Sequence, residues 1–180
     1  MTEGRLVGPI PEGQDPEDYD RMRRRVLWSL PTGLYVLGSV ADGRRNLMTL
    51  NWANQVATDP KLVAVSIETP AVTHDLVGRG RVFSLSVMPR EERAVIRKFV
   101  KPLDDDGRPG ELAGFAVTTA VTGAPILASA IAWLDCRVIH DVPCGSHTVF
   151  IGEVVDCAEV PRDGSEGVLR MEDTRMSYGG

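Results

Sequence analysis

The sequence predicts a mainly β protein whose strands form a closed antiparallel barrel, with two or three helices at its edges. Segments in which apolar and polar residues alternate recur along the chain, and short turn sequences such as Asp42-Gly43 join several of them. Parallel strands need a long crossover connection, which such turns do not provide. The pattern therefore favours an antiparallel barrel over a doubly wound sheet.

The first elements follow from composition and capping signals. Residues 1–15 are rich in glycine and proline and predict a flexible arm, which precedes one domain over residues 16–180. Asp15 is a suitable N-cap for a helix that begins at Pro16. We expect the buried stripe of this helix to consist of Met22, Val26 and Leu30.

The later elements alternate between short strands and loops. The loop over residues 101–110 holds three consecutive aspartates, but it lacks the spaced ligand set of a cation site, which favours a solvated loop. The helix at 91–100 is amphipathic, with Ala94, Val95, Ile96 and Phe99 on its inner side. The predicted strands cover residues 34–40, 47–67 (two strands divided at Asp59-Pro60), 82–88, 126–139, 147–160 and 168–171, and the predicted helices cover 71–77 and 91–100.

The first strand of the 47–67 stretch has two different faces, because side chains alternate along a strand. One face is apolar, and the other is small and able to form hydrogen bonds. A surface of this kind indicates a wall that a ligand approaches closely, and a partly solvated strand face is the alternative. The apolar set is Met48, Leu50, Trp52 and Val56, and the small polar set is Thr49, Asn51, Ala53, Gln55 and Ala57.

Composition restricts the classes of partner. Of the 180 residues, 43% are hydrophobic and 25% are charged, as in ordinary globular proteins. The net charge of -5 argues against a nucleic-acid or anionic-membrane binder, since either needs a basic field. No apolar run approaches the ~18 residues of a membrane span, and no signal peptide is visible. The three cysteines form no CxxC pair, so we expect a cytoplasmic protein.

Common catalytic motifs are absent from the sequence. It contains no Walker loop, no GxGxxG, no GxSxG elbow and no HExxH or HxH pair, so neither a hydrolase elbow nor a zinc site is indicated. Cys144 and His147 are close in sequence, but no orienting group or oxyanion loop accompanies them. An enzyme of this sequence would therefore take its reactive atom from a cofactor.

An ordered series of segments resembles the flavin reductase-like family of FMN-binding split barrels, over about residues 25 to 160. No single motif is decisive, but the order of the series is specific. The segments are Pro31-Thr-Gly33, Asn46-Leu-Met-Thr-Leu-Asn51, Asp59-Pro60, Leu62-Val-Ala-Val-Ser-Ile67, Thr73-His74, Gly80-Arg-Val-Phe83-Ser-Leu-Ser-Val87, Gly123-Ala-Pro-Ile-Leu127, Ala132-Trp-Leu-Asp-Cys-Arg137 and Gly145-Ser-His-Thr-Val-Phe-Ile-Gly-Glu-Val154.

The resemblance implies that a flavin lies along the small polar face. Thr49 and Asn51 are the side chains expected to meet it, and Thr73 is expected at the phosphate, helped by the N–H groups of the following helix. His147 is the expected catalytic residue: it matches a family position near the nicotinamide and the flavin ring, where it would orient NAD(P)H or assist electron delivery, although a structural histidine is equally consistent. Tyr178 is expected to cover the flavin. The full set of expected cofactor-binding residues is Met48, Thr49, Leu50, Asn51, Trp52, Ala53, Ser66, Ile67, Thr73 and Tyr178.

Several positions depart from the family pattern. Thr69 and Val72 stand at positions where family members often have basic residues that hold the phosphate. The grip on the phosphate is therefore weaker, unless Arg44, Arg45 or Arg79 takes over this role. Trp52 and Ala53 invert a small-then-aromatic order, and Ser146 stands in place of an aspartate.

The resemblance implies an NAD(P)H:flavin oxidoreductase that reduces FMN or FAD with NADH or NADPH and supplies a partner monooxygenase. It also implies a homodimer, and no metal. Two alternatives remain open: a flavin-binding carrier without efficient turnover, and a flavin oxidoreductase that acts on another organic substrate. The sequence does not separate FMN from FAD or NADH from NADPH.

Overall fold

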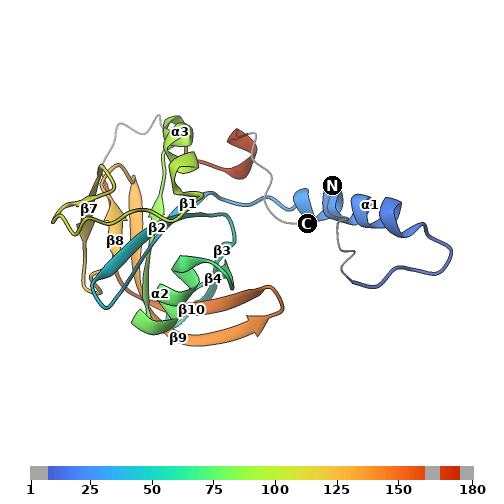
Figure 1. The fold of residues 1–180 in the computed structure, drawn as a ribbon, viewed down its shortest axis with the longest axis horizontal. Coiled ribbons are helices and arrows are strands. Elements are labelled where there is room, and N and C mark those ends of the chain that lie inside the picture. Colours follow the sequence, from blue (N-terminus) through green and yellow to red (C-terminus); the bar gives the residue numbers. More distant parts are fainter. Residues whose placement is uncertain (1–7, 161–166, 175–180) are drawn as a thin grey trace. The chain divides into compact units, whose positions relative to one another are not determined.

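The computed structural model describes residues 8–160 and 167–174. The chain divides into two compact units: residues 1–31 with 175–180, and residues 32–174. Figure 1 shows the strands gathered in the second unit and α1 (Pro16–Trp28) in the first. The domain boundary that the sequence predicts, between residues 15 and 16, remains a prediction.

The helix α1 begins as its capping signals predict. The Asp15 carboxylate accepts hydrogen bonds from the main-chain N–H groups of Glu17 and Asp18, at 3.1 and 3.0 Å. The predicted buried stripe is wrong: Met22, Val26 and Leu30 are 40, 58 and 63% exposed. The helix has no buried residue, and no other regular element is found among the described residues of its unit.

A large antiparallel sheet confirms the mainly β prediction. Its hydrogen-bonded order is β2-β1-β5-β9-β10-β4-β3, so β2 and β3 are its edges, and the described strands do not close into a barrel. The two edges follow each other in the chain through Asn51 and Trp52 alone, which brings the end of one beside the start of the other. The strands are β1 (Tyr35–Ala41), β2 (Arg44–Leu50), β3 (Ala53–Thr58), β4 (Lys61–Glu68), β5 (Val82–Val87), β9 (Ala132–Cys144) and β10 (His147–Glu159).

Smaller elements complete this unit. None of the helices among the described residues is long and apolar enough to span a bilayer. The elements are the sheet of β6 (Glu111–Leu112), β7 (Phe115–Thr119) and β8 (Pro125–Leu127), the α-helices α2 (Val72–Gly80) and α3 (Arg93–Ile96), and the 3-10 helices η1 (Arg90–Glu92), η2 (Arg97–Phe99) and η3 (Met171–Asp173).

Turns and helix ends follow the sequence in part. Asp42 and Gly43 both have positive φ, 48° and 78°, as a tight hairpin turn requires. The predicted connection at 141–146 is shorter than expected, because β9 continues to Cys144 and the chain turns at Gly145. The predicted helix at 91–100 is divided between η1, α3 and η2, and Ala94 is exposed rather than inward-facing. The predicted final strand at 168–171 forms only isolated bridges, at Val168 and Arg170, before η3.

The small residues of β1 and β5 allow β8 to approach the large sheet closely. The Ser84 hydroxyl donates to the Pro125 carbonyl at 2.6 Å, and the Leu127 N–H donates to the Ser86 hydroxyl at 3.1 Å. A Cβ atom at Gly38 would lie 1.8 Å from the Pro125 oxygen. The polar face of the strand at 82–88 is therefore a packing surface within the protein.

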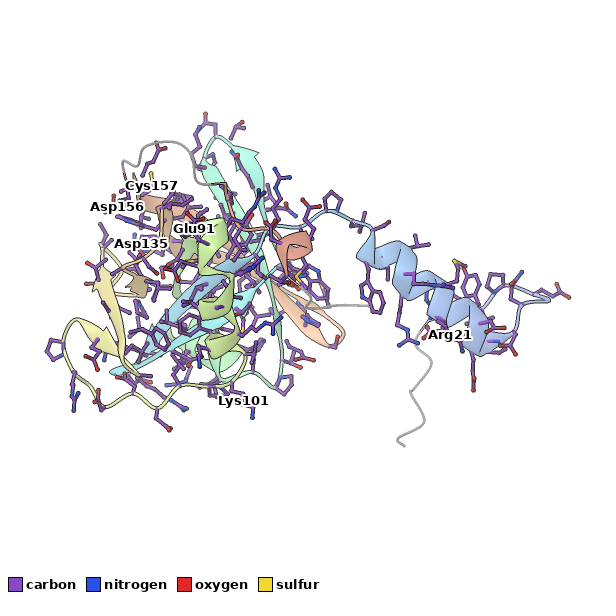
Figure 2. The ribbon with its side chains drawn as sticks, turned by 90° about the horizontal axis from the view of Figure 1, so that it is seen from above. Arg21, Glu91, Lys101, Asp135, Asp156 and Cys157 are labelled. Carbon is purple, nitrogen blue, oxygen red and sulfur yellow. The ribbon has the colours of Figure 1, made fainter. Side chains whose placement is uncertain are left out.

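A buried carboxylate extends this attachment to β9. Asp135 is fully buried and accepts from the N–H and the hydroxyl of Thr122, at 2.7 and 2.5 Å. Its register partner on β10 is Asp156, and both are labelled in Figure 2. The segment that precedes β8 is thus fixed to the large sheet by side-chain hydrogen bonds.

An ion pair fixes the aspartate-rich loop. Arg45 binds Asp105 through two nitrogens, at 2.9 and 2.6 Å, and also donates to the carbonyls of Arg108 and Glu111. The Asp105 side chain is only 8% exposed, so the expectation of a solvated loop is wrong at this residue. The hydrogen bond from Arg45 lowers the pKa of Asp105 to about 2.

Candidate functional site

The strand predicted from residue 47 onward is interrupted at its middle. Asn51 and Trp52 lie outside β2 and β3, and Leu50 and Ala53 are both buried, at 6 and 7% exposure. Strict alternation would place Leu50 and Ala53 on opposite faces. The two-residue corner resets the alternation, and Val56, predicted on the apolar face, is 52% exposed. The prediction of one continuous, small and polar strand face is therefore wrong.

Before the corner, Thr49 and Met48 take structural positions. Thr49 is 8% exposed, and its hydroxyl donates to the Ile96 carbonyl at 2.5 Å, which fixes α3 to β2. Met48 is half-buried and packs against the hydrophobic core. The Thr49 side chain is therefore used within the protein, and a ligand could meet only the main chain of this residue.

Two polar groups at the corner remain unused. The Asn51 side chain is half-buried, and its carboxamide forms no hydrogen bond with any residue that the structure describes. Ser66 of β4 lies beside the corner, since its N–H donates to the Trp52 carbonyl at 3.0 Å. The Ser66 hydroxyl likewise has no partner within the described part of the chain. A half-buried amide and hydroxyl without partners suit a bound polar ligand.

The start of β10 joins this corner. The rings of His147 and Trp52 lie 4.9 Å apart between centroids, and their planes are inclined by 55°. The Ser146 hydroxyl lies 2.8 Å from His147 Nδ1, and the Ser146 carbonyl accepts from the N–H and the hydroxyl of Thr69, at 3.0 and 3.2 Å. Sequence-predicted residues from β4, β10 and the corner are thus in contact.

The expected phosphate residue lies inside the fold. Thr73, in the first turn of α2, is 1% exposed, and its hydroxyl accepts from Asn46 Nδ2 at 2.8 Å. Asn46 also accepts from the Leu103 N–H at 3.0 Å, so it links β2, α2 and the following loop. Asn46 is not among the site residues expected from the sequence, although an amide in a β-strand is a usable signal.

The arginines proposed to replace the family's basic residues are mostly committed elsewhere. Arg45 is held by Asp105, and Arg79 is held by Asp75 at 2.8 Å and by Asp42. The hydrogen bond with Asp75 raises the pKa of Arg79. Arg44 is exposed and forms no ion pair with a described residue.

The remaining expected residues divide into two groups. Leu50, Ala53 and Ile67 are buried in the core, so a ligand can meet only their main-chain groups. Tyr178 lies outside the described residues. Within those residues, no three histidine, cysteine or carboxylate side chains form a metal-binding group.

These features define a mainly β protein with a polar site at the corner between its two edge strands. The profile of the flavin reductase like domain matches residues 27–179, and the chain belongs to this family. The chain is 31% identical over 168 residues to an NADH-dependent FAD reductase of Streptomyces globisporus, with 91% of this chain and 88% of that protein covered. It is 27% identical over 133 residues to the reductase component of a 4-nitrophenol monooxygenase of Rhodococcus opacus, with 74 and 69% covered.

A solved structure of a flavin reductase is also similar to this chain in fold and sequence. The NADH:FAD oxidoreductase of Streptomyces globisporus, solved with NAD and FAD fragments, superposes with a TM-score of 0.72 and 27% identity. The superposition covers 89% of this chain and 92% of that chain.

Proposed function

We propose that this chain is an NAD(P)H-dependent flavin reductase, which binds FMN or FAD and reduces it with NADH or NADPH. Its family supports this function, as do relatives named for NADH-dependent flavin reduction. The structural observation that carries the proposal is the unpartnered Asn51 carboxamide, half-buried at the corner between β2 and β3. When bound, a flavin accepts hydride from the reduced nicotinamide at N5, which is chemistry that the side chains lack.

The residues at the corner suit the polar edge of a flavin ring. The Asn51 amide offers both a donor and an acceptor, and the Ser66 hydroxyl offers another pair. The main chain from Met48 to Ala53 supplies further N–H and carbonyl groups. The main-chain groups of Ile67 and of the first turn of α2, which includes the buried Thr73, would face the ribityl and phosphate groups, where the N–H groups of the helix favour an anion. The work of the chain is to orient the reactants and to exclude water.

The proposal extends to the assembly of the protein, its barrel, its partner and the cover of its flavin. We expect a homodimer that completes each site, and a split barrel that the curved sheet forms around the corner. The reduced flavin would pass to a flavin-dependent monooxygenase, and the Rhodococcus relative, which is named the reductase component of a monooxygenase, supports this. Tyr178 would cover the flavin.

The test compares two asparagines three residues apart. Asn51→Ala should raise the KM for flavin about fivefold, because a hydrogen bond to a bound ligand contributes about 1 kcal/mol. Asn54→Ala is the matched control, since Asn54 is exposed on β3 and lies outside the proposed site. Steady-state NADH and NADPH oxidation with FMN and FAD measures both variants. Equal KM values in the two variants would remove Asn51 from the site, and wild-type protein that oxidises neither nicotinamide with either flavin would exclude the reductase.

A flavin carrier is the second candidate. Arg45 and Arg79 are paired within the protein, so neither is free to hold a phosphate in the way that the family's basic residues do. A purified protein that is yellow but oxidises neither NADH nor NADPH would favour the carrier. A colourless protein that binds neither FMN nor FAD would exclude both candidates.

A further inference from the structure

The imidazole of His147 is held from two directions. Trp52 contacts it from the corner between β2 and β3, with 4.9 Å between the ring centroids. The Ser146 hydroxyl contacts Nδ1 at 2.8 Å. Nε2 hydrogen-bonds to no residue that the structure describes. The ring is therefore oriented at one nitrogen and one face, and it has one polar atom left for a ligand.

Both holding residues are themselves fixed by the same segment. The Ser146 carbonyl accepts two hydrogen bonds from Thr69, and the Trp52 carbonyl accepts one from Ser66. Ser66 lies in β4 and Thr69 directly follows that strand. The position that often carries a basic residue in the family is used here to fix the turn that precedes His147.

The direction of the hydrogen bond between the Ser146 hydroxyl and Nδ1 is coupled to which ring nitrogen carries the proton. A carboxylate there can only accept, so it would require a proton on Nδ1 and leave Nε2 bare in the neutral ring. A serine hydroxyl can donate. The Ser146 hydroxyl has no other partner in the described part of the chain, so its proton is available for Nδ1.

We propose that Ser146 and Trp52 are positioning residues that present His147 as a neutral hydrogen-bond donor. Ser146 donates to Nδ1 and places the ring proton on Nε2, while Trp52 fixes the plane of the ring. The group that receives this hydrogen bond is a carbonyl oxygen, of the kind carried by the flavin ring and by the nicotinamide carboxamide. This inference rests on the proposed reductase function for its ligand, but the state of the ring is a property of the protein alone.

The charged and titratable neighbours of His147 are few. Its register partners are Glu68 on β4 and Cys144 on β9, and both are exposed. No ion pair joins Glu68 to His147 among the described residues. Cys144 makes no contact with the ring that would orient it, so Cys144→Ser serves as a matched control on the adjacent strand.

Nitrogen-15 NMR of the full-length, histidine-labelled protein without flavin tests the ring state, at a pH where the ring is neutral. We expect the unprotonated nitrogen of His147 to be Nδ1 in the wild type, in Ser146→Thr and in Cys144→Ser. Ser146→Asp should reverse the assignment, and Ser146→Ala should give a mixture of the two forms. A wild-type ring protonated on Nδ1, or no change in Ser146→Ala, would overturn the proposal.

Kinetics and ring contacts test the consequence. Ser146→Asp should lower kcat/KM for the nicotinamide about tenfold, because one hydrogen-bond donor to the ligand is lost. Ser146→Thr keeps the hydroxyl and should therefore keep the wild-type value. Trp52→Ala should remove the cross-relaxation between the rings at positions 52 and 147, whereas Trp52→Phe should keep an aromatic contact with His147. A His147 ring that keeps its wild-type chemical shifts in Trp52→Ala would overturn the role of Trp52. Failure of the wild type to oxidise NADH or NADPH would refute the reductase and leave the NMR result standing.

Discussion

The ion pair between Arg45 and Asp105 should contribute to the free energy of unfolding in a way that depends on pH. The ordinary pKa of an aspartate is 3.8, and in the folded protein the Arg45 hydrogen bond lowers that of Asp105 to about 2. Each pKa unit corresponds to about 1.4 kcal/mol, so the pair stabilises the fold by about 2 kcal/mol at neutral pH. Removal of the carboxylate would also leave the Arg45 guanidinium, which is 15% exposed, with only carbonyl partners.

The perturbation is Asp105→Asn, measured by urea unfolding over a series of pH values. Because the folded pKa is depressed, the stabilisation is present above about pH 4 and is lost as pH falls through about 2. The variant should therefore be about 2 kcal/mol less stable than wild type at neutral pH, and the difference should shrink in acid. Asp106→Asn is the control, since that side chain is 50% exposed. A difference that does not change with pH would refute the ion-pair reasoning, and so would an equal loss in the control.

Two further predictions concern packing and thiol chemistry. Gly38→Ala should destabilise the fold by about 2 kcal/mol or more, because its new methyl group would meet the Pro125 carbonyl at 1.8 Å, and thermal melting would measure the loss. Burial raises the pKa of the Cys136 thiol to about 12, so a thiol reagent should modify Cys144 and Cys157 in the native protein and all three cysteines only after unfolding. Rapid native modification of Cys136 would contradict its placement in the core.

Local signals predicted the elements whose causes are local. Asp15 fixes the start of α1 through its own carboxylate, and the pair Asp42-Gly43 adopts the two positive φ values that a tight turn needs. The strand at 82–88 was also correctly placed as β5. For the helix cap and the turn, the determining interactions lie within a few residues of one another, so the sequence pattern is sufficient. The strand β5 was found from its alternation alone, although its partners β1 and β9 are distant in the sequence.

Contacts between distant segments account for what the sequence could not predict. The sequence shows two serines in β5, Ser84 and Ser86, but only the structure shows that β8 packs on them through Pro125 and Leu127. Asn46 was not selected because its partners, Thr73 and Leu103, lie 27 and 57 residues away. Alternation along a strand states which side chains share a face, but it does not state what covers that face.

The corner at Asn51 and Trp52 explains why the stretch at 47–67 indicated a ligand site although its predicted continuous polar face was wrong. A continuous strand would have satisfied its main-chain groups in the sheet and aligned its small polar residues on one face. The interruption instead buries Thr49 and Ala53 and leaves the Asn51 side chain half-buried, with no hydrogen-bond partner in the described part of the chain. It also turns Trp52 toward His147. A break in a regular pattern is destabilising unless other contacts over-determine it, and here β4 does so through Ser66. The departure from regular strand geometry is therefore the observation on which the proposed site at this corner rests.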